Sequence, residues 1–190
     1  FGAFRQAVAL DPKLYDARSE MGTIFLLAKD LPKAKEQAEA VLAGDPNNIS
    51  GHMLMSNIYA VENNIDQAIA ESRKAVSLDP KKIEAYIQLA NLYVANKDLP
   101  QAEQALRAAV GADAGSVTAR TALGAFLLRS GKREQAEAEY LAATQIKKDD
   151  PHPYMNLGNF YAVLNRPEDA EKQYLKAIDK APKDMALRLY

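Results

Sequence analysis

SLDPKKIEAYIQLANLY, residues 77–93, places an Asp-Pro pair immediately ahead of an amphipathic run. Similar phrases recur along the whole chain at a constant spacing of 34 residues. The proline column of this pattern, with its two substitutions, contains Pro12, Pro46, Pro80, Ala114, Lys148 and Pro182. A fixed spacing of this length is typical of proteins built from stacked structural repeats.

Three other columns keep the same spacing and differ in side-chain size. The first holds small residues, namely Gly22, Ser56, Ala90, Gly124 and Gly158, and the second holds alanine at positions 34, 68, 102, 136 and 170. The third is large and mostly aromatic, and it contains Phe25, Tyr59, Tyr93, Leu127 and Tyr161. We expect the small residues to let neighbouring helices approach closely and to form sockets for the aromatic column.

Each repeat is predicted to contain two helices. Apolar residues recur at three- and four-residue steps over 83–93 and again over 102–109, which is the period of an amphipathic helix. In the intervening turn, Asp98 is a predicted N-cap and Pro100 suits the first turn of the second helix. The Asp-Pro pairs then end each second helix, because proline disfavours helical geometry at the residue before it.

This pattern predicts a single all-α repeat domain over residues 1–190. A single helix pair cannot bury both of its faces, so successive pairs must stack to form a core. The predicted divisions are a partial repeat at 1–14 with a helix at about 2–10, five full repeats at 15–48, 49–82, 83–116, 117–150 and 151–184, and the start of another helix at 185–190. We expect the chain to belong to a larger protein and its ends, including Phe1, Phe4 and Val8, to self-associate.

Composition and charge indicate which kinds of partner and environment to expect for this chain. The chain has 48% hydrophobic residues, and its 24 Lys+Arg and 25 Asp+Glu leave a net charge of -1, so we expect no nucleic-acid partner. No apolar run reaches the ~20 residues of a membrane span, so we expect no membrane insertion. The absence of cysteine excludes disulfides and is compatible with both the cytoplasm and an oxidising periplasm, so the localisation stays unknown.

The sequence contains no recognisable catalytic constellation. His52 and His152 are the only histidines; His52 is interpreted as a packing residue rather than a ligand, and His152 falls in a turn. No nucleophile, base and oxyanion donor are assembled by the repeat pattern, so we expect a non-enzymatic protein with no cofactor and no metal.

The repeated columns resemble the tetratricopeptide repeat family. The fullest match is Tyr154-x2-Leu157-Gly158-x2-Tyr161, followed by Ala170-x3-Tyr174, Ala177 and Pro182. The resemblance implies a right-handed α-solenoid of antiparallel helix pairs. It also implies that the first helices line a concave groove in which an extended or helical peptide binds, and therefore a protein or peptide partner.

The inward-facing slots of the first helices predict where that groove lies. Its predicted residues are Met53, Asn57, Ala60, Glu84, Ile87, Asn91, Val94, Arg129, Met155 and Asn159. Asparagine carries both a donor and an acceptor and can pair with a peptide backbone irrespective of sequence, whereas methionine gives adaptable apolar contact. The alternative is that the asparagines only hydrate the groove.

Two other functions remain open from the sequence alone. The repeats could form a structural spacer that assembles through its ends, or the non-catalytic arm of an enzyme such as a repeat-containing glycosyltransferase. The arrangement of lysine, asparagine and arginine by which chaperone-type relatives clamp a C-terminal carboxylate is absent, because the corresponding slots hold other residues: Ser19, Met53 and Ile87, or Glu20, Leu54 and Gln88.

Overall fold

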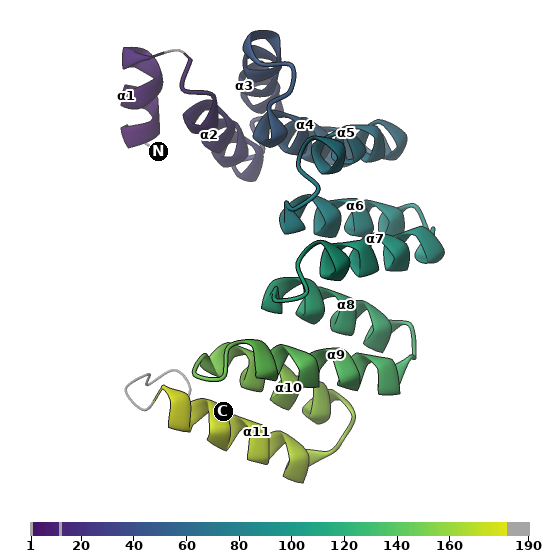
Figure 1. The fold of residues 1–190 in the computed structure, drawn as a ribbon. Coiled ribbons are helices and arrows are strands. Elements are labelled where there is room, and N and C mark those ends of the chain that lie inside the picture. The colour runs from purple at the N-terminus through teal and green to yellow at the C-terminus, as the bar shows by residue number, and fades with distance from the viewer. Residues whose placement is uncertain (1, 12, 182–190) are drawn as a thin grey trace. The chain divides into compact units, whose positions relative to one another are not determined.

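The computed structural model describes residues 2–11 and 13–181, and the regular structure within them is entirely helical (Figure 1). The helices are α1 (Gly2–Leu10), α2 (Tyr15–Leu27), α3 (Leu31–Gly44), α4 (Ile49–Val61), α5 (Ile65–Leu78), α6 (Ile83–Ala95), α7 (Leu99–Ala112), α8 (Val117–Arg129), α9 (Arg133–Ile146), α10 (Pro151–Val163) and α11 (Pro167–Lys180). The prediction of an all-α repeat fold is confirmed. Among the described helices, none combines the length and the apolar character needed to cross a membrane.

Several sequence predictions lie outside the described residues. They concern Phe1, Pro12, Pro182 and the further helix expected at 185–190. The lone helix predicted at about 2–10 is present as α1, and the side chain of Phe4 within it is exposed.

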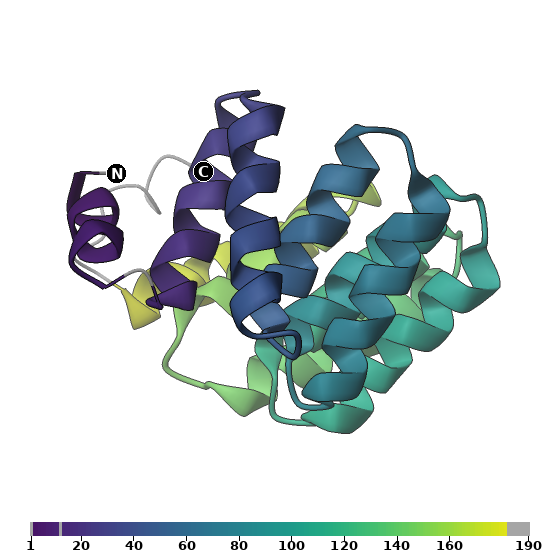
Figure 2. The same cartoon turned by 90° about the horizontal axis from the view of Figure 1, so that it is seen from above.

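The chain divides into two compact units, residues 1–105 and 106–190, with the boundary inside α7. In the first unit, α2 packs on α3 and α4 packs on α5, so each first helix lies against its own second helix. Figure 2 shows α2 and α3 side by side in purple and blue. The first helices α2, α4 and α6 also contact one another in sequence, which places one side of each on a common face. The second unit repeats this arrangement with α8 on α9, α10 on α11 and α8 on α10.

The N-cap predicted at Asp98 is present, and Asp30 and Asp150 cap their helices in the same way. The Asp30 carboxylate accepts the Lys33 N–H at 3.3 Å, and Asp98 accepts the Gln101 N–H at 3.2 Å. At the boundary between the fourth and fifth repeats, the Asp150 carboxylate accepts the His152 N–H at 3.0 Å and forms the N-cap of α10. These carboxylates satisfy backbone donors that have no partner within the helix.

The small columns form the contact surface between helices. The alanines at 34, 68, 102 and 136 are fully buried, and Ala170 is nearly so. The predicted socket is wrong in one respect, because the rings that lie over Gly124 and Gly158 are Tyr140 and Tyr174 of the paired second helices. A Cβ atom at Gly158 would lie 2.5 Å from Cε1 of Tyr174, so glycine is needed for this approach.

The first two repeats have no tyrosine to cover the small residue of their first helix. Their second helices carry Ala38 and Ser72 in place of a tyrosine, and both side chains are fully buried. Leu54 of the next repeat lies over Gly22, and the Ser56 hydroxyl donates to the carbonyl of Ala68 at 2.8 Å while lying 3.0 Å from the Ser72 hydroxyl. Leu54 in the first of these repeats and the Ser56–Ser72 pair in the second therefore take the place that a tyrosine ring has in the later repeats.

We expect Ala68→Leu to lower the free energy of unfolding by about 1–3 kcal/mol, because added methyl groups in a packed interface force side chains and backbone apart. Ala68 is fully buried between α4 and α5. The matched control is Ala70→Leu in the same helix, where the side chain is exposed. Urea unfolding followed by circular dichroism measures both variants, and equal midpoints would contradict the packing assigned to the alanine column.

Candidate functional site

A groove crosses the first helices of the first unit and consists of two adjoining hollows. The α4–α6 hollow has a volume of about 480 Å³ and is lined by Met53, Asn57, Ala60, Glu84, Ile87, Gln88, Asn91, Leu92 and Ala95. The α2–α4 hollow has a volume of about 760 Å³ and is lined by Thr23, Leu26, Leu27, Lys29, Leu31, Asn57, Ala60 and Val61. Because Asn57 and Ala60 line both, the two hollows adjoin at α4, and we call them together the first-helix groove.

Local structure explains why these side chains share one surface. Residues four apart on a helix lie on the same face, and the lining residues of α4 and α6 follow this step, as in Met53 and Asn57 or Ile87 and Asn91. The start of α4 is set by Asn48, whose side-chain oxygen accepts the Gly51 N–H at 2.9 Å. The buried side of α4 carries Ser56, whose hydroxyl donates to the Ala68 carbonyl oxygen of α5.

The structure brings together six of the ten predicted groove residues. Met53, Asn57, Ala60, Glu84, Ile87 and Asn91 all line the α4–α6 hollow. Val94 is half-buried and is not among its lining residues. Asn159 lies in the second unit and lines a separate hollow of about 180 Å³, whereas Met155 and Arg129 are not among the lining residues of that hollow.

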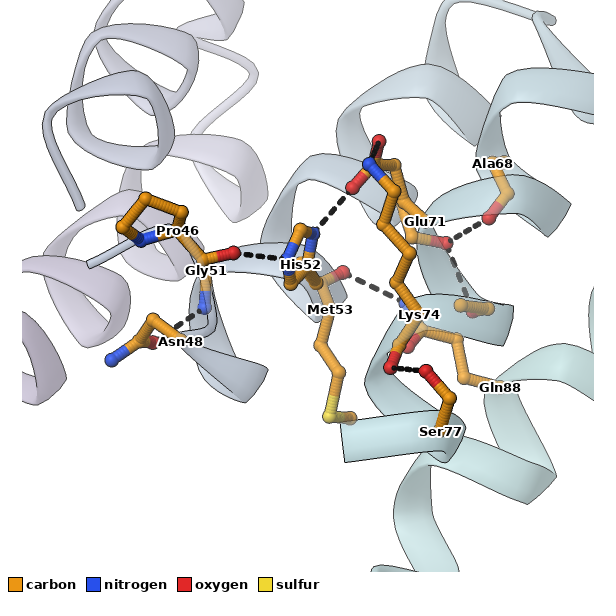
Figure 3. Close-up of polar contacts among 12 residues, drawn as sticks. Pro46, Asn48, Gly51, His52, Met53, Ala68, Glu71, Lys74, Ser77 and Gln88 are labelled. Carbon is orange, nitrogen blue, oxygen red and sulfur yellow. Dashed lines mark hydrogen bonds and ion pairs between the residues drawn. The ribbon is translucent and has the colours of Figure 1, made fainter. Parts of the chain in front are cut away.

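Gln88 of α6 connects two adjacent repeats across the floor of the groove. Its Nε2 donates to the backbone oxygen of Met53 at 2.8 Å, as Figure 3 shows, and to Oδ1 of Asn57 at 2.7 Å. The orientation of the amide follows from chemistry, because the Met53 carbonyl can only accept and therefore requires the nitrogen of Gln88 to face it. The Oε1 atom of Gln88 is buried and has no hydrogen-bond partner among the described residues.

The three predicted asparagines consequently differ in what they can offer a ligand. Asn57 already accepts one hydrogen bond from Gln88, and Asn159 accepts one from the Tyr174 hydroxyl at 2.8 Å. Each keeps its two N–H donors and one acceptor lone pair. Asn91 is exposed in the α4–α6 hollow, and its side chain makes no hydrogen bond with any described residue. Its full hydrogen-bonding capacity is therefore available.

The α2–α4 hollow supplies an apolar part of the groove that the sequence analysis missed. Leu27 and Val61 line it and are 79% and 60% exposed, respectively. They occupy one column of the 34-residue pattern, which continues with Ala95, Arg129 and Val163. This largely apolar column at the ends of the first helices is the sequence pattern that could have predicted the apolar walls of the α2–α4 hollow. Gln88 carried no comparable signal, since its role depends on atoms of the preceding repeat.

His52 is a structural residue, as its interpretation from the sequence suggested. It is buried, its Nδ1 lies 2.5 Å from Oε2 of Glu71, and its Nε2 lies 2.9 Å from the carbonyl oxygen of Pro46 (Figure 3). These contacts join the turn before α4 to α5. The part of the chain that the structure describes contains no group of three or more histidine, aspartate or glutamate side chains that could hold a metal ion.

Comparison with protein families identifies the repeats. Models described as tetratricopeptide repeat match residues 62–125, 95–155 and 151–184, so that together they cover most of the chain. A comparison of the sequence with curated proteins finds no match.

Solved structures with the same fold include three proteins known by crystallography. YrrB, described as a TPR protein with an unusual peptide-binding site, is 22% identical with a TM-score of 0.56, and the match covers 98% of this chain and 96% of that one. TTC0263, a thermophilic TPR protein from Thermus thermophilus, is 22% identical with a TM-score of 0.67, covering 92% and 95%. MamA is 25% identical with a TM-score of 0.63, covering 87% and 96%. The fold is therefore that of an all-α solenoid of helical repeats.

Proposed function

Because the chain belongs to the tetratricopeptide repeat family, we propose that it is a protein-interaction scaffold that binds an extended or helical peptide segment in the first-helix groove. The observation that carries this proposal is the pair of adjoining hollows over α2, α4 and α6, which share Asn57 and Ala60. Two adjoining hollows on neighbouring helices can accept successive side chains of one extended segment, whereas a single isolated hollow suits one side chain.

The chemistry of the groove supports a peptide ligand. A peptide backbone presents alternating donors and acceptors, and Asn91 faces the α4–α6 hollow with an amide that is free of internal hydrogen bonds. Met53 and Ile87 lie one helical turn before Asn57 and Asn91, respectively, and add apolar surface to the same hollow. Affinity from backbone hydrogen bonds combined with tolerant apolar contact is a common arrangement in peptide recognition.

Fold and chemistry together favour binding over catalysis. YrrB, which shares the fold, is described as having a peptide-binding site, and this lends support to a similar use of the groove here. The residues that line the first-helix groove are mainly apolar or amide side chains, with Lys29 and Glu84 as its charged members. Such a set can bind and orient a partner but contains no nucleophile paired with a base.

We expect Asn91→Ala to weaken binding by about 0.5–1.5 kcal/mol, the usual net contribution of one hydrogen bond. Peptide ligands selected on the full chain from a displayed library supply the partner, and titration calorimetry measures the affinity. The free energy of unfolding should stay within about 0.5 kcal/mol of the original value, because an exposed groove residue supports no core contact.

The matched control is Asn47→Ala, which removes an exposed asparagine from the turn between α3 and α4 and outside the groove. Asn57→Ala is less selective, because it also removes the acceptor that holds Gln88. If selected peptides bind Asn91→Ala and the original chain equally well, and their binding sites map away from α4 and α6, the proposed function is wrong.

A further inference from the structure

The α2–α4 hollow combines exposed apolar walls with one charged group. Leu27 and Val61 stand at its rim, and Leu26 and Ala60 are half-buried within it. Large apolar side chains that remain exposed around a concavity are typical of an interaction site. The lining residue with a charge is Lys29, in the turn between α2 and α3.

The positive charge of Lys29 is not neutralised within the described residues. Its ammonium group pairs with no carboxylate there, whereas Lys33 lies 2.6 Å from Asp30 and Lys35 lies 3.9 Å from Glu62. The hydrogen bond from Lys33 also holds the pKa of Asp30 below its usual range, so that this carboxylate is already compensated. The rim of the hollow therefore carries an unpaired cation beside its apolar walls.

The opposite end of the groove has a different charge balance. Glu84 lines the α4–α6 hollow, and its carboxylate lies 3.7 Å from the ammonium group of Lys82. This pair leaves no net charge for a ligand to match. Selection by charge is therefore expected only beside Lys29.

We propose that the α2–α4 hollow receives an apolar side chain of the bound segment and that Lys29 selects an acidic side chain next to it. This inference rests on the proposed function, since it assigns the chemistry of the same ligand. Neighbouring packed helices lie about 8–10 Å apart, so the path from α2 to α6 spans roughly 16–20 Å. An extended segment of about six residues covers this length at ~3.3 Å per residue.

Blocked hexapeptides test the inference directly on the full chain. The probe is acetyl-Asp-Leu-Ala-Ala-Ala-Gly-amide, and its counterparts replace aspartate by asparagine or leucine by serine. Because both ends are blocked, an acidic side chain is the probe's only carboxylate. Titration followed by two-dimensional amide NMR measures millimolar affinities and locates each probe on the chain.

We expect the acidic probe to bind about 2–5-fold more tightly than the asparagine probe, the range of an exposed ion pair. It should perturb amides of α2, α4 and α6, and the serine probe should bind at least about tenfold more weakly because it loses a buried leucine side chain. Lys29→Gln should abolish the preference for the acidic probe. Leu27→Asn should weaken the leucine probes without changing stability, since Leu27 is largely exposed.

Lys97→Gln is the matched control. Lys97 occupies the same column as Lys29, two repeats further along, and has nearly the same backbone conformation, with φ of 61° against 62°. It is not among the lining residues of either hollow of the groove. Its replacement should leave the preference for the acidic probe unchanged.

The outcomes separate this inference from the proposed function. Equal binding of the acidic and asparagine probes in the groove, or a preference that survives Lys29→Gln, overturns the inference and leaves the proposed function in place. A preference lost equally in Lys97→Gln also overturns it. If no probe perturbs α2, α4 or α6, the inference fails and the groove itself loses support as the binding site.

Discussion

Phe160→Ala should lower the free energy of unfolding by about 3–5 kcal/mol, the largest effect expected of any single substitution considered for this chain. Phe160 lies in α10 and is 2% exposed. Its ring centroid is 5.2 Å from that of Tyr140 and 5.4 Å from that of Tyr161. Alanine would leave a cavity at the centre of this aromatic cluster and would also remove favourable ring–ring contacts.

Urea unfolding measures the overall loss, and hydrogen exchange resolved by helix shows where it falls. Exchange protection should decrease in α8–α11, because local stability follows the density of buried apolar contact. The control is Val163→Ala in the same helix, since Val163 is 71% exposed and its replacement should change stability by less than about 0.5 kcal/mol. Similar losses for both variants would show that Phe160 does not occupy the core of the second unit.

Tyr161→Phe should lower the free energy of unfolding by about 1.5–3 kcal/mol near neutral pH, the range for a hydrogen bond to a charged group. The Tyr161 hydroxyl donates to Oε1 of Glu137 at 2.7 Å and thereby joins α10 to α9. Arg166 lies over the Tyr161 ring, with its guanidinium carbon 4.5 Å from the centroid, and is 3.4 Å from the same carboxylate oxygen.

The contribution of Tyr161 should also depend on pH. Burial, together with the hydrogen bond to Glu137, raises the pKa of Tyr161 to about 12, whereas an unfolded tyrosine titrates near pH ~10. The folded state thus favours the protonated phenol, so the stabilisation is complete below about pH 10 and is lost as the pH rises through about 12. The phenolate that forms there faces the carboxylate of Glu137.

We would measure the free energy of unfolding of the original chain and of Tyr161→Phe from neutral to strongly alkaline pH. The difference between them isolates the contribution of the Tyr161 hydroxyl from the titration of other groups. The difference between the two should shrink above about pH 10. Tyr154→Phe is the control in the same helix, because its exposed hydroxyl only reaches the carbonyl oxygen of Lys148 at 3.3 Å. A difference that stays constant to the highest pH would contradict the pKa assigned to Tyr161.

Much of the fold could be predicted from the sequence because the relevant interactions are local or periodic. A capping carboxylate such as Asp30 or Asp98 binds a backbone N–H only three residues away, so a short stretch of sequence predicts it. The alanine column is buried in all five repeats because residues 34 apart occupy equivalent environments. The helix order and the all-α architecture follow from the same period.

The candidate site was predictable in part. The four-residue step of a helix placed Met53 with Asn57 and Ile87 with Asn91 on one face, and these residues do line one hollow. Their role in binding stays a prediction. The distribution of Asn159, Met155 and Arg129 was less predictable, because residues of one column, such as Asn57 and Asn159, can line different hollows.

The sequence by itself determined the repeat length, the helices, their caps and the buried small columns, since each depends on neighbours within one repeat or on an exact periodicity. Only the tertiary structure decided that Leu54 covers Gly22, that Tyr174 covers Gly158 and that Gln88 holds Asn57. It also decided that Lys29 lines a hollow with Val61. The physical reason is that such pairs form where side chains of different helices meet, and their meeting depends on helix rotation and side-chain volume, which the spacing of residues does not specify.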